Sequence, residues 1–252
     1  MQTRKLHSWN LSYSQARKLQ TQLACKVEFT PLKELPKLIA GIDCAFSKDG
    51  KKIIAAVVVL KLPDFVSVET TSALRKVSFP YIPGLLSFRE APVCIAAVKK
   101  LKTEPDVFII DGQGIAHPRR LGLAAHLGLF FDKPTIGCAK SRLTGYFDDP
   151  PPQKGAYTFL KDKTSNEPRL SAAASAKAEA TSPARITGGA SDETIGAVVK
   201  TRTNVKPVFV SVGNKMLLED AIKITLDCTT KYRLPEPIRL THQLVSKLKL
   251  KA

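Results

Sequence analysis

The sequence predicts an α/β fold built on a mixed β-sheet, because it combines an antiparallel start with a parallel continuation. The antiparallel start consists of three strand-like segments separated by short turn signals, residues 38–46, 52–61 and 66–77. The parallel continuation begins with a helical segment, residues 87–101, which leads into an apolar run at residues 107–110. A helix that links strands in this way is typical of a parallel crossover.

Each of these segments has local signals of its own. Residues 11–27 have apolar side chains at roughly helical spacing and are expected to form an amphipathic helix. The pair Asp49–Gly50 is a strong signal for a two-residue β-hairpin between the first two strands. Ser87, with Glu90 three residues later, fits a capping box at the start of the next helix.

The second half of the chain continues the alternation around one unusual segment. Residues 161–194 contain no aromatic residue and are rich in Ala, Ser, Thr, Lys and Glu, so we expect a flexible or partly helical surface insertion there. We expect the whole chain, residues 1–252, to form one domain that carries this insertion. The other expected elements are helices at 121–131, 216–228 and 238–250, and strands at 134–139, 195–200 and 208–212.

The charge balance is the most informative property of the composition. The 252 residues include 39 Lys and Arg against 22 Asp and Glu, a formal net charge of +17. Such an excess favours a polyanionic partner, and nucleic acid is the first candidate. An anionic membrane surface is a weaker alternative, because no strongly amphipathic basic helix stands out.

The composition argues against a zinc protein and against a membrane protein. The five cysteines are widely spaced without a CxxC pair and there are only four histidines, which argues against a zinc site and favours reduced cysteines. The longest apolar runs, such as residues 53–60, are too short to cross a bilayer. The N-terminus has no apolar signal core, so we expect an intracellular protein without a membrane partner.

One loop gathers several chemically useful side chains at the end of a strand. The apolar run at residues 107–110 is followed by Asp111, then by glycines that let the backbone turn sharply, and then by His117, Arg119 and Arg120. A carboxylate next to a core is costly unless it is paired or binds a metal. The plain alternative is a strand-end aspartate that caps a turn, with both arginines as surface charge.

Three acids are expected to converge near this loop. Asp43 lies in the first strand, Glu90 at the start of the following helix and Asp111 at the end of the next strand. Clustered carboxylates repel one another without a cation, and oxygen ligands suit Mg²⁺ or Mn²⁺. A basic protein with such a site is a candidate phosphodiesterase. Taken singly, Asp43 could be a buried hydrogen-bonded acid, Glu90 a helix cap and Asp111 a turn residue.

Several sequence blocks closely resemble the endonuclease V family, and they occur in the order of that family. The resemblance covers nearly the whole chain apart from residues 161–194, and it implies an RNase H-like fold with helices on both faces of a mixed sheet. The blocks are GIDCAF (41–46), PYIPGLLSFRE (80–90), DGQGIAHPRRLG (111–122), PTIGCAKSRLTG (134–145), KPVFVSVGN (206–214) and YRLPEPIR (232–239).

The resemblance implies an activity and roles for individual residues. The family cleaves inosine-containing nucleic acid at the second phosphodiester bond 3′ to inosine, with Mg²⁺ or Mn²⁺, and leaves a 3′-hydroxyl and a 5′-phosphate. By the motifs, Asp43 and Asp111 would be metal ligands, and Glu90 would complete the acidic centre directly or through water. Lys140 would lie near the scissile phosphate. His117 would sit beside metal and phosphate, or would fix the glycine loop as a structural histidine.

Other blocks of the family imply contacts to the nucleic acid. The segment Pro80, Tyr81, Ile82 and Pro83 would form a rigid wedge that separates strands and helps to hold the flipped base. The base pocket would be built mainly from backbone groups, and the phosphates would be bound by polar side chains. The candidates for the pocket are Gly84, Leu85, Gly112 and Gly114, and those for phosphate are Arg119, Arg120 and Asn214; one of the two arginines could instead tie the loop to an acid.

Asn214 is also a departure from the family. Family members commonly have a histidine at the corresponding position, and asparagine cannot donate a titratable proton. Gln113 is a second departure, in a position often held by a different polar residue.

The alternatives to an inosine-specific nuclease are a protein that binds inosine-containing strands with weak or no cleavage, and an RNase H-like nuclease without base preference. Single-stranded RNA and DNA both stay open as substrates. The long insertion and the basic C-terminus resemble a eukaryotic member, for which RNA would be favoured and the cytoplasm or nucleus expected. We expect a monomer.

Overall fold

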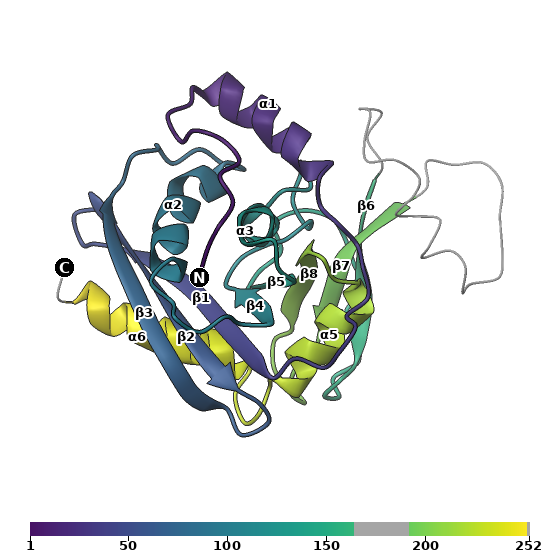
Figure 1. Ribbon diagram of the computed structural model, residues 1–252. Coiled ribbons are helices and arrows are strands. Elements are labelled where there is room, and N and C mark those ends of the chain that lie inside the picture. Colours follow the sequence, from purple (N-terminus) through teal and green to yellow (C-terminus); the bar gives the residue numbers. More distant parts are fainter. Residues whose placement is uncertain (164–191, 251–252) are drawn as a thin grey trace.

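The strands of the protein form one mixed sheet (Figure 1). The computed structural model describes residues 1–163 and 192–250. The strands are β1 (Leu38–Phe46), β2 (Lys52–Lys61), β3 (Val66–Lys76), β4 (Val107–Ile110), β5 (Thr135–Ala139), β6 (Tyr157–Lys163), β7 (Asp192–Val199) and β8 (Val208–Asn214). Their order across the eight-stranded sheet is β3-β2-β1-β4-β5-β8-β7-β6.

The predicted combination of an antiparallel start and parallel crossovers is confirmed. Strands β1, β2 and β3 pair antiparallel in sequence order. Helix α2 (Leu86–Val98) then leads to β4, which pairs in parallel with β1, and α3 (Leu123–Phe131) leads to β5, which pairs in parallel with β4. The carboxyl ends of β1, β4 and β5 therefore lie at the same edge of the sheet.

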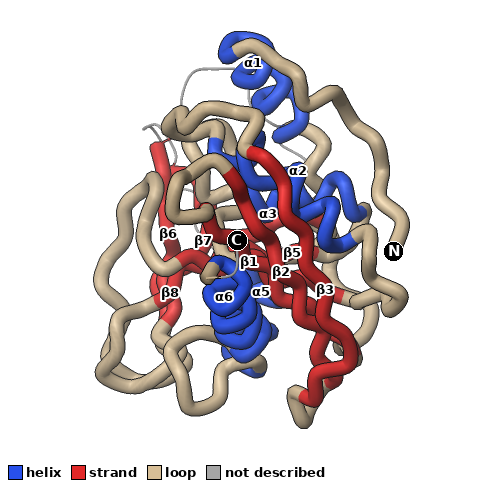
Figure 2. Tube along the Cα trace, turned by 90° about the vertical axis from the view of Figure 1, so that its left-hand side faces the viewer, coloured by secondary structure: helices blue, strands red, loops and turns tan. Residues whose placement is uncertain are grey.

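Helices cover both faces of the sheet. Helices α2 and α3 lie on one side of the central strands and α6 (Glu236–Lys249) on the other, against β1 and β2 (Figure 2). Helix α5 (Leu218–Asp227) packs on β7 and β8, and α1 (Tyr13–Ala24) lies outside α3. Within the described part of the chain, no helix has both the length and the apolar character needed to span a bilayer.

The alternation of side chains along β1 determines which of its residues face α6. Ala40 and Ile42 are fully buried in the cluster formed with α2 and α3. Gly41 faces the opposite side, where a Cβ atom would come within 2.1 Å of the Pro237 carbonyl oxygen of α6. This glycine allows the helix to approach the strand closely. Because side chains alternate between the two faces, Asp43 points to the same side as Gly41, toward α6.

The boundaries of the predicted insertion are wrong. Residues 161–163 belong to β6 and residues 192–194 to β7, and Lys161 pairs with Thr194 in an antiparallel ladder. Strand β6 was not predicted, because its polar second half resembles the composition of the following segment. Residues 164–191, the rest of the predicted insertion, lie outside the described residues.

Two local predictions are also wrong. Residues 47–51 connect β1 to β2, so the hairpin connection is longer than two residues; the hydroxyl of Ser47 donates to Asp49 at 2.6 Å and closes the longer turn. The capping box does not form, because α2 begins at Leu86 and its N-terminus has no side-chain cap. Ser87 instead lies 3.1 Å from His126 Nδ1, and Glu90 is buried within the helix.

Candidate active site

Asp43 and Asp111 are brought together by the register of two parallel strands. Ile42 of β1 pairs with Ile110 of β4, and the Asp111 amide donates to the Ile42 carbonyl oxygen at 3.0 Å. The next residue along each strand is therefore an aspartate. The convergence of these two acids, expected from the sequence, is a direct result of this pairing.

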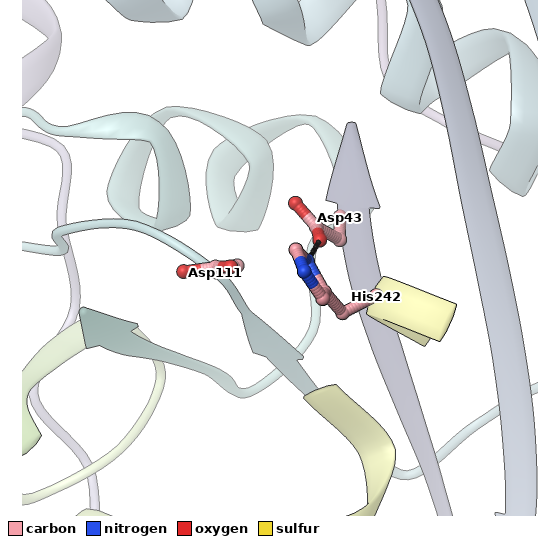
Figure 3. Close-up of side chains that lie close together, drawn as sticks. All are labelled: Asp43, Asp111 and His242. Atoms are coloured by element: carbon pink, nitrogen blue, oxygen red, sulfur yellow. Dashed lines mark hydrogen bonds and ion pairs between the residues drawn. The ribbon is translucent and has the colours of Figure 1, made fainter. Parts of the chain in front are cut away.

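The third member of the cluster is a histidine that the sequence analysis did not identify. His242 of α6 places its Nδ1 2.7 Å from Asp43 Oδ2, and Figure 3 shows its ring beside both aspartates. One ligand atom from each of Asp43, Asp111 and His242 lies within 4.8 Å of the other two. The helical pattern at the C-terminus was visible in the sequence, but no signal indicated which face of that helix would meet β1.

The carboxylates of Asp43 and Asp111 repel each other when no cation lies between them. Burial and the nearby charge of Asp111 raise the pKa of Asp43, whereas the hydrogen bond from His242 and the charge of Lys140 act in the opposite direction. The second carboxylate oxygen, Asp43 Oδ1, accepts from the Cys44 amide at 2.7 Å. Hydrogen bonds therefore fix the orientation of the Asp43 carboxylate before any ligand binds.

Lys140, which was expected near the scissile phosphate, lies beside the acids. It follows β5 directly, and its ammonium group forms an ion pair with Asp111 Oδ2. Because β5 pairs with β4 in parallel, Lys140 emerges at the same edge of the sheet as Asp111. The lysine is partly exposed, so it can also contact an anionic ligand at this edge.

Glu90 belongs to the electrostatic surroundings of the site, but it is not a member of the three-residue group. It comes from α2, which covers the face of the sheet opposite to α6. Burial, together with the charges of Asp43 and Asp111, raises its pKa to about 7, although a hydrogen bond with Cys44 acts in the opposite direction. The prediction that Glu90 is a direct ligand is therefore not supported, whereas a contact through water stays open.

The donor set fits a hard or borderline divalent cation. Two carboxylates and an imidazole with ligand atoms this close together are typical ligands of Mn²⁺, and the carboxylates also suit Mg²⁺. A cation would relieve the repulsion that raises the pKa of Asp43. These three residues can therefore hold a metal ion.

His117 has the structural role that the sequence left as the alternative. It is buried, its Nε2 lies 3.0 Å from the Gly84 carbonyl oxygen, and its Nδ1 accepts from the Arg119 amide at 3.0 Å. Burial and the charge of Arg119 lower its pKa to about 3, so the ring is neutral and carries its proton on Nε2. Both nitrogens are occupied in holding two loops together, and its predicted place beside the metal is not supported.

The predicted wedge is only partly exposed. Tyr81 is 69% exposed, and Pro80 and Pro83 are exposed on either side of it. Ile82 instead packs against a buried cluster that includes Phe79 and Phe88, so it is not available to insert between bases as part of the wedge. Tyr81 is therefore the exposed aromatic side chain of this loop.

Most backbone groups proposed for the base pocket already have partners. The Gly84 carbonyl oxygen is contacted by Gln20, Arg119 and His117, and the Leu85 amide donates to the Ile82 carbonyl oxygen. The Gly114 amide donates to Ser211 Oγ at 2.8 Å, and its carbonyl oxygen accepts from Gly122. These groups shape the loops, and they are not open to a base in this conformation. Gly112 is partly exposed.

The two arginines have internal partners. Arg120 is buried and pairs with Asp162 and Glu193 at the ends of β6 and β7, so its predicted phosphate contact is wrong and the alternative of a tie to an acid is confirmed. Arg119 is half-buried and donates to Gln20 and Gly84, which joins α1 to the wedge loop.

Asn214 does not belong to the site. It is buried, its Oδ1 accepts from the Glu28 amide at 3.0 Å, and its Nδ2 donates to the Gly128 carbonyl oxygen. The predicted phosphate contact at this position is therefore wrong. The imidazole beside the two aspartates comes from His242 of α6 and not from position 214.

Known proteins share both the sequence and the fold of this chain. A family model described as Endonuclease V matches residues 21–243. Endonuclease V from Dictyoglomus turgidum is 42% identical over 240 residues, which cover 95% of this chain and 91% of that protein. The crystal structure of endonuclease V from Streptomyces avermitilis superposes with a TM-score of 0.81 at 34% identity, over 100% of this chain and 99% of the other.

Endonuclease V from Ciona intestinalis was solved in complex with a 24mer DNA that contains an inosine followed by a ribo-adenosine. Its superposition covers 94% of this chain and 98% of the Ciona chain. Its TM-score is 0.70 at 29% identity. The insertion and basic C-terminus therefore do not make this sequence more similar to that eukaryotic protein than to the bacterial ones. The mixed sheet with helices on both faces agrees with the expected RNase H-like fold. The chain belongs to the endonuclease V family of nucleases.

Proposed function

We propose that this protein is a metal-dependent endonuclease that cleaves inosine-containing single-stranded RNA or DNA. Cleavage occurs at the second phosphodiester bond 3′ to inosine and leaves a 3′-hydroxyl and a 5′-phosphate. The observation that carries the proposal is the group formed by Asp43, Asp111 and His242 in a member of the endonuclease V family. The net charge of +17 and the DNA-bound Ciona relative support a nucleic acid substrate.

The side chains around the group have distinct roles in this proposal. Asp43, Asp111 and His242 hold Mg²⁺ or Mn²⁺, which supplies Lewis-acid stabilisation of charge on the phosphate when bound. Lys140, already beside Asp111, holds the scissile phosphate at the edge of the sheet. Glu90 acts through water from the α2 side, because it lies outside the group of possible direct ligands.

The wedge loop supplies the base preference. Tyr81 is the exposed aromatic side chain of this loop, held between two prolines that limit its backbone freedom. A pre-ordered ring can stack on a flipped or neighbouring base at a small entropic cost.

The protein acts as a monomer in this proposal, since both carboxylates and the imidazole come from one chain.

A paired cleavage assay tests the proposal. Labelled RNA and DNA strands with one inosine, and matched strands with adenosine, are incubated with Mg²⁺, Mn²⁺ or EDTA. We expect a metal-dependent cut at the second bond 3′ to inosine and no cut in the adenosine strands, and the faster strand identifies the preferred sugar. The Asp111→Asn variant controls for contaminating nucleases.

Two other outcomes define the alternatives. Tight inosine-dependent binding without cutting under any metal condition would make the protein a binding module. Equal cutting of inosine and adenosine strands would make it a nuclease without base preference. The position of His242 counts against the binding module, because it supplies the imidazole that Asn214 lacks.

A further inference from the structure

A groove of about 320 Å³ lies beside the start of α2, away from the three-residue group. Its lining in the described part of the chain includes three cationic residues, Arg75, Lys76 and Arg89, and no acidic one. Trp9 forms an apolar wall, and its ring stacks on Phe130 with centroids 5.2 Å apart. A concave, positively charged space with a fixed aromatic wall is suited to an anionic ligand with an apolar part.

Arg89 is the anchor of this groove. Its guanidinium group lies over the Phe46 ring at 4.5 Å from the centroid, which fixes its position. Its Nε is buried and has no hydrogen-bond partner within the residues that the structure describes. A buried donor without a partner is destabilising, and a phosphate oxygen would satisfy it with a charge-assisted bond.

The groove is within reach of a strand bound at the acids. Phe46 pairs with Ile53 of β2, and Ile53 pairs with Arg75 of β3, so the groove lies at the level of Phe46. Phe46 is three residues beyond Asp43 on β1, about 10 Å along the strand, and Arg75 is two strands away, about 10 Å across the sheet. Ser78, another lining residue, precedes the wedge residue Tyr81 by three positions.

We infer that this groove binds a phosphodiester of the substrate strand a few nucleotides from the cleavage site. Arg75, Lys76 and Arg89 contact the phosphate, and Trp9 contacts the adjoining sugar or base. The inference rests on the proposed function, because it assigns the ligand as the same nucleic acid strand. The contact is to the backbone, so it adds affinity without base preference.

Binding measurements in EDTA separate this groove from cleavage. The variant Arg75→Gln/Lys76→Gln changes two exposed side chains, and Lys99→Gln/Lys102→Gln removes the same charge at the other end of α2. Fluorescence anisotropy gives Kd for inosine and adenosine strands at several salt concentrations. For the groove variant we expect Kd to rise about tenfold, and the slope of log Kd against log salt to fall by about 1.4, equally for both strands.

Each contrary result has a definite meaning. A slope that changes as much in the Lys99→Gln/Lys102→Gln control shows a general charge effect and overturns the inference. A loss confined to the inosine strand overturns the backbone contact. Competition by free adenosine monophosphate at low concentration would make the groove a nucleotide site instead. If the wild-type protein never cuts but the groove variant still loses affinity and slope, the proposed function fails while the groove stands.

Discussion

His242 Nδ1 lies 2.7 Å from Asp43 Oδ2, although 199 positions separate the two residues in the chain. The contact joins a helix on one face of the sheet to the first strand, and it depends on the close approach of α6 to Gly41. The acidic centre is therefore completed by a helix whose position is determined by packing and not by the strands that carry the acids.

Replacing His242 by alanine is expected to weaken metal binding. The substitution removes one of three possible ligands and the hydrogen bond that orients Asp43, so the Mn²⁺ concentration for half-maximal cleavage should rise at least about tenfold. Isothermal titration with Mn²⁺ measures the affinity directly. Gln243→Ala, a change at the exposed neighbouring position, is the control. Equal metal affinity of His242→Ala and wild type would remove His242 from the site.

Asp43→Asn should abolish cleavage and stabilise the metal-free protein. Burial and the Asp111 charge raise the pKa of Asp43, so an uncharged amide of the same shape removes an unfavourable charge. Its oxygen can still accept from the Cys44 amide. We expect Tm in EDTA to rise by about 2–4 °C per kcal/mol gained. Added Mn²⁺ should stabilise the wild type but not the variant, and a lower Tm in EDTA would contradict the argument.

Gly41→Ala is expected to separate α6 from β1. The new Cβ would meet the Pro237 carbonyl oxygen at 2.1 Å and Thr241 Oγ1 at 2.6 Å, and a backbone carbonyl cannot yield without moving the helix. We expect a loss of about 3 kcal/mol or more in the free energy of unfolding, together with weaker metal binding. Urea unfolding measures the first and titration with Mn²⁺ the second.

Gly50→Ala is the matched control for this substitution. Gly50 also lies in the β1–β2 region, with φ of +69° and no atom within 4 Å of a new Cβ. The cost should be limited to backbone strain, about 1 kcal/mol, with normal metal affinity. Equal effects of the two substitutions would show that Gly41 has no special role in placing α6.

His126 should make the protein less stable in acid. Burial and then the charge of His7 lower its pKa to about 3, from an ordinary value of 6.5. Between these two values the unfolded chain binds a proton that the folded chain does not, so this histidine's contribution to stability is lost as pH falls below 6.5. Glu90, with a pKa raised to about 7, acts in the opposite direction between 7 and 4.5.

The comparison with His126→Gln isolates the histidine from the acids. Urea unfolding at several values between pH 6.5 and pH 4 should show the wild type losing stability relative to the variant, by up to about 1.4 kcal/mol per pH unit. Parallel pH profiles for the two proteins would show that His126 does not titrate in this way.

Tyr81→Ala should reduce the preference for inosine while leaving residual cutting. Tyr81 is 69% exposed, and the described structure does not bury it against the core, so the change should affect the ligand and not the fold. The ratio of kcat/KM for inosine and adenosine strands is the measurement. Loss of a base–aromatic contact corresponds to about 1–3 kcal/mol, or roughly tenfold to a hundredfold. An unchanged ratio would exclude a wedge role for Tyr81, and Tyr13→Ala on α1 serves as an exposed-tyrosine control.

The sequence predicted well what depends on neighbouring residues. Alternation and apolar runs identified β1, β2, β4 and the crossover helices, and one acid within the first strand and another after β4 predicted that Asp43 and Asp111 would meet. The polar end of β6 could not be recognised, because it becomes a strand only by pairing with β7.

The sequence could not predict which distant residues would surround each candidate side chain. Arg120 looked like a phosphate ligand, but Asp162 and Glu193 reach it from distant strands. His117 and Asn214 looked catalytic or ligand-binding, yet both are buried among backbone groups. His242 was missed for the same reason, since its role depends on the face of α6 that packs against β1.

The half-exposed side chain of His242 makes the third ligand the adjustable member of the three-residue group. The positions of the two aspartates follow from the pairing of β1 with β4, and both carboxylates belong to the three-residue group. His242 is 50% exposed and is attached to a helix, so an acid or an amide there can be accommodated without repacking the core. A substitution at this single position therefore changes the donor set offered to the metal while both aspartates stay in place.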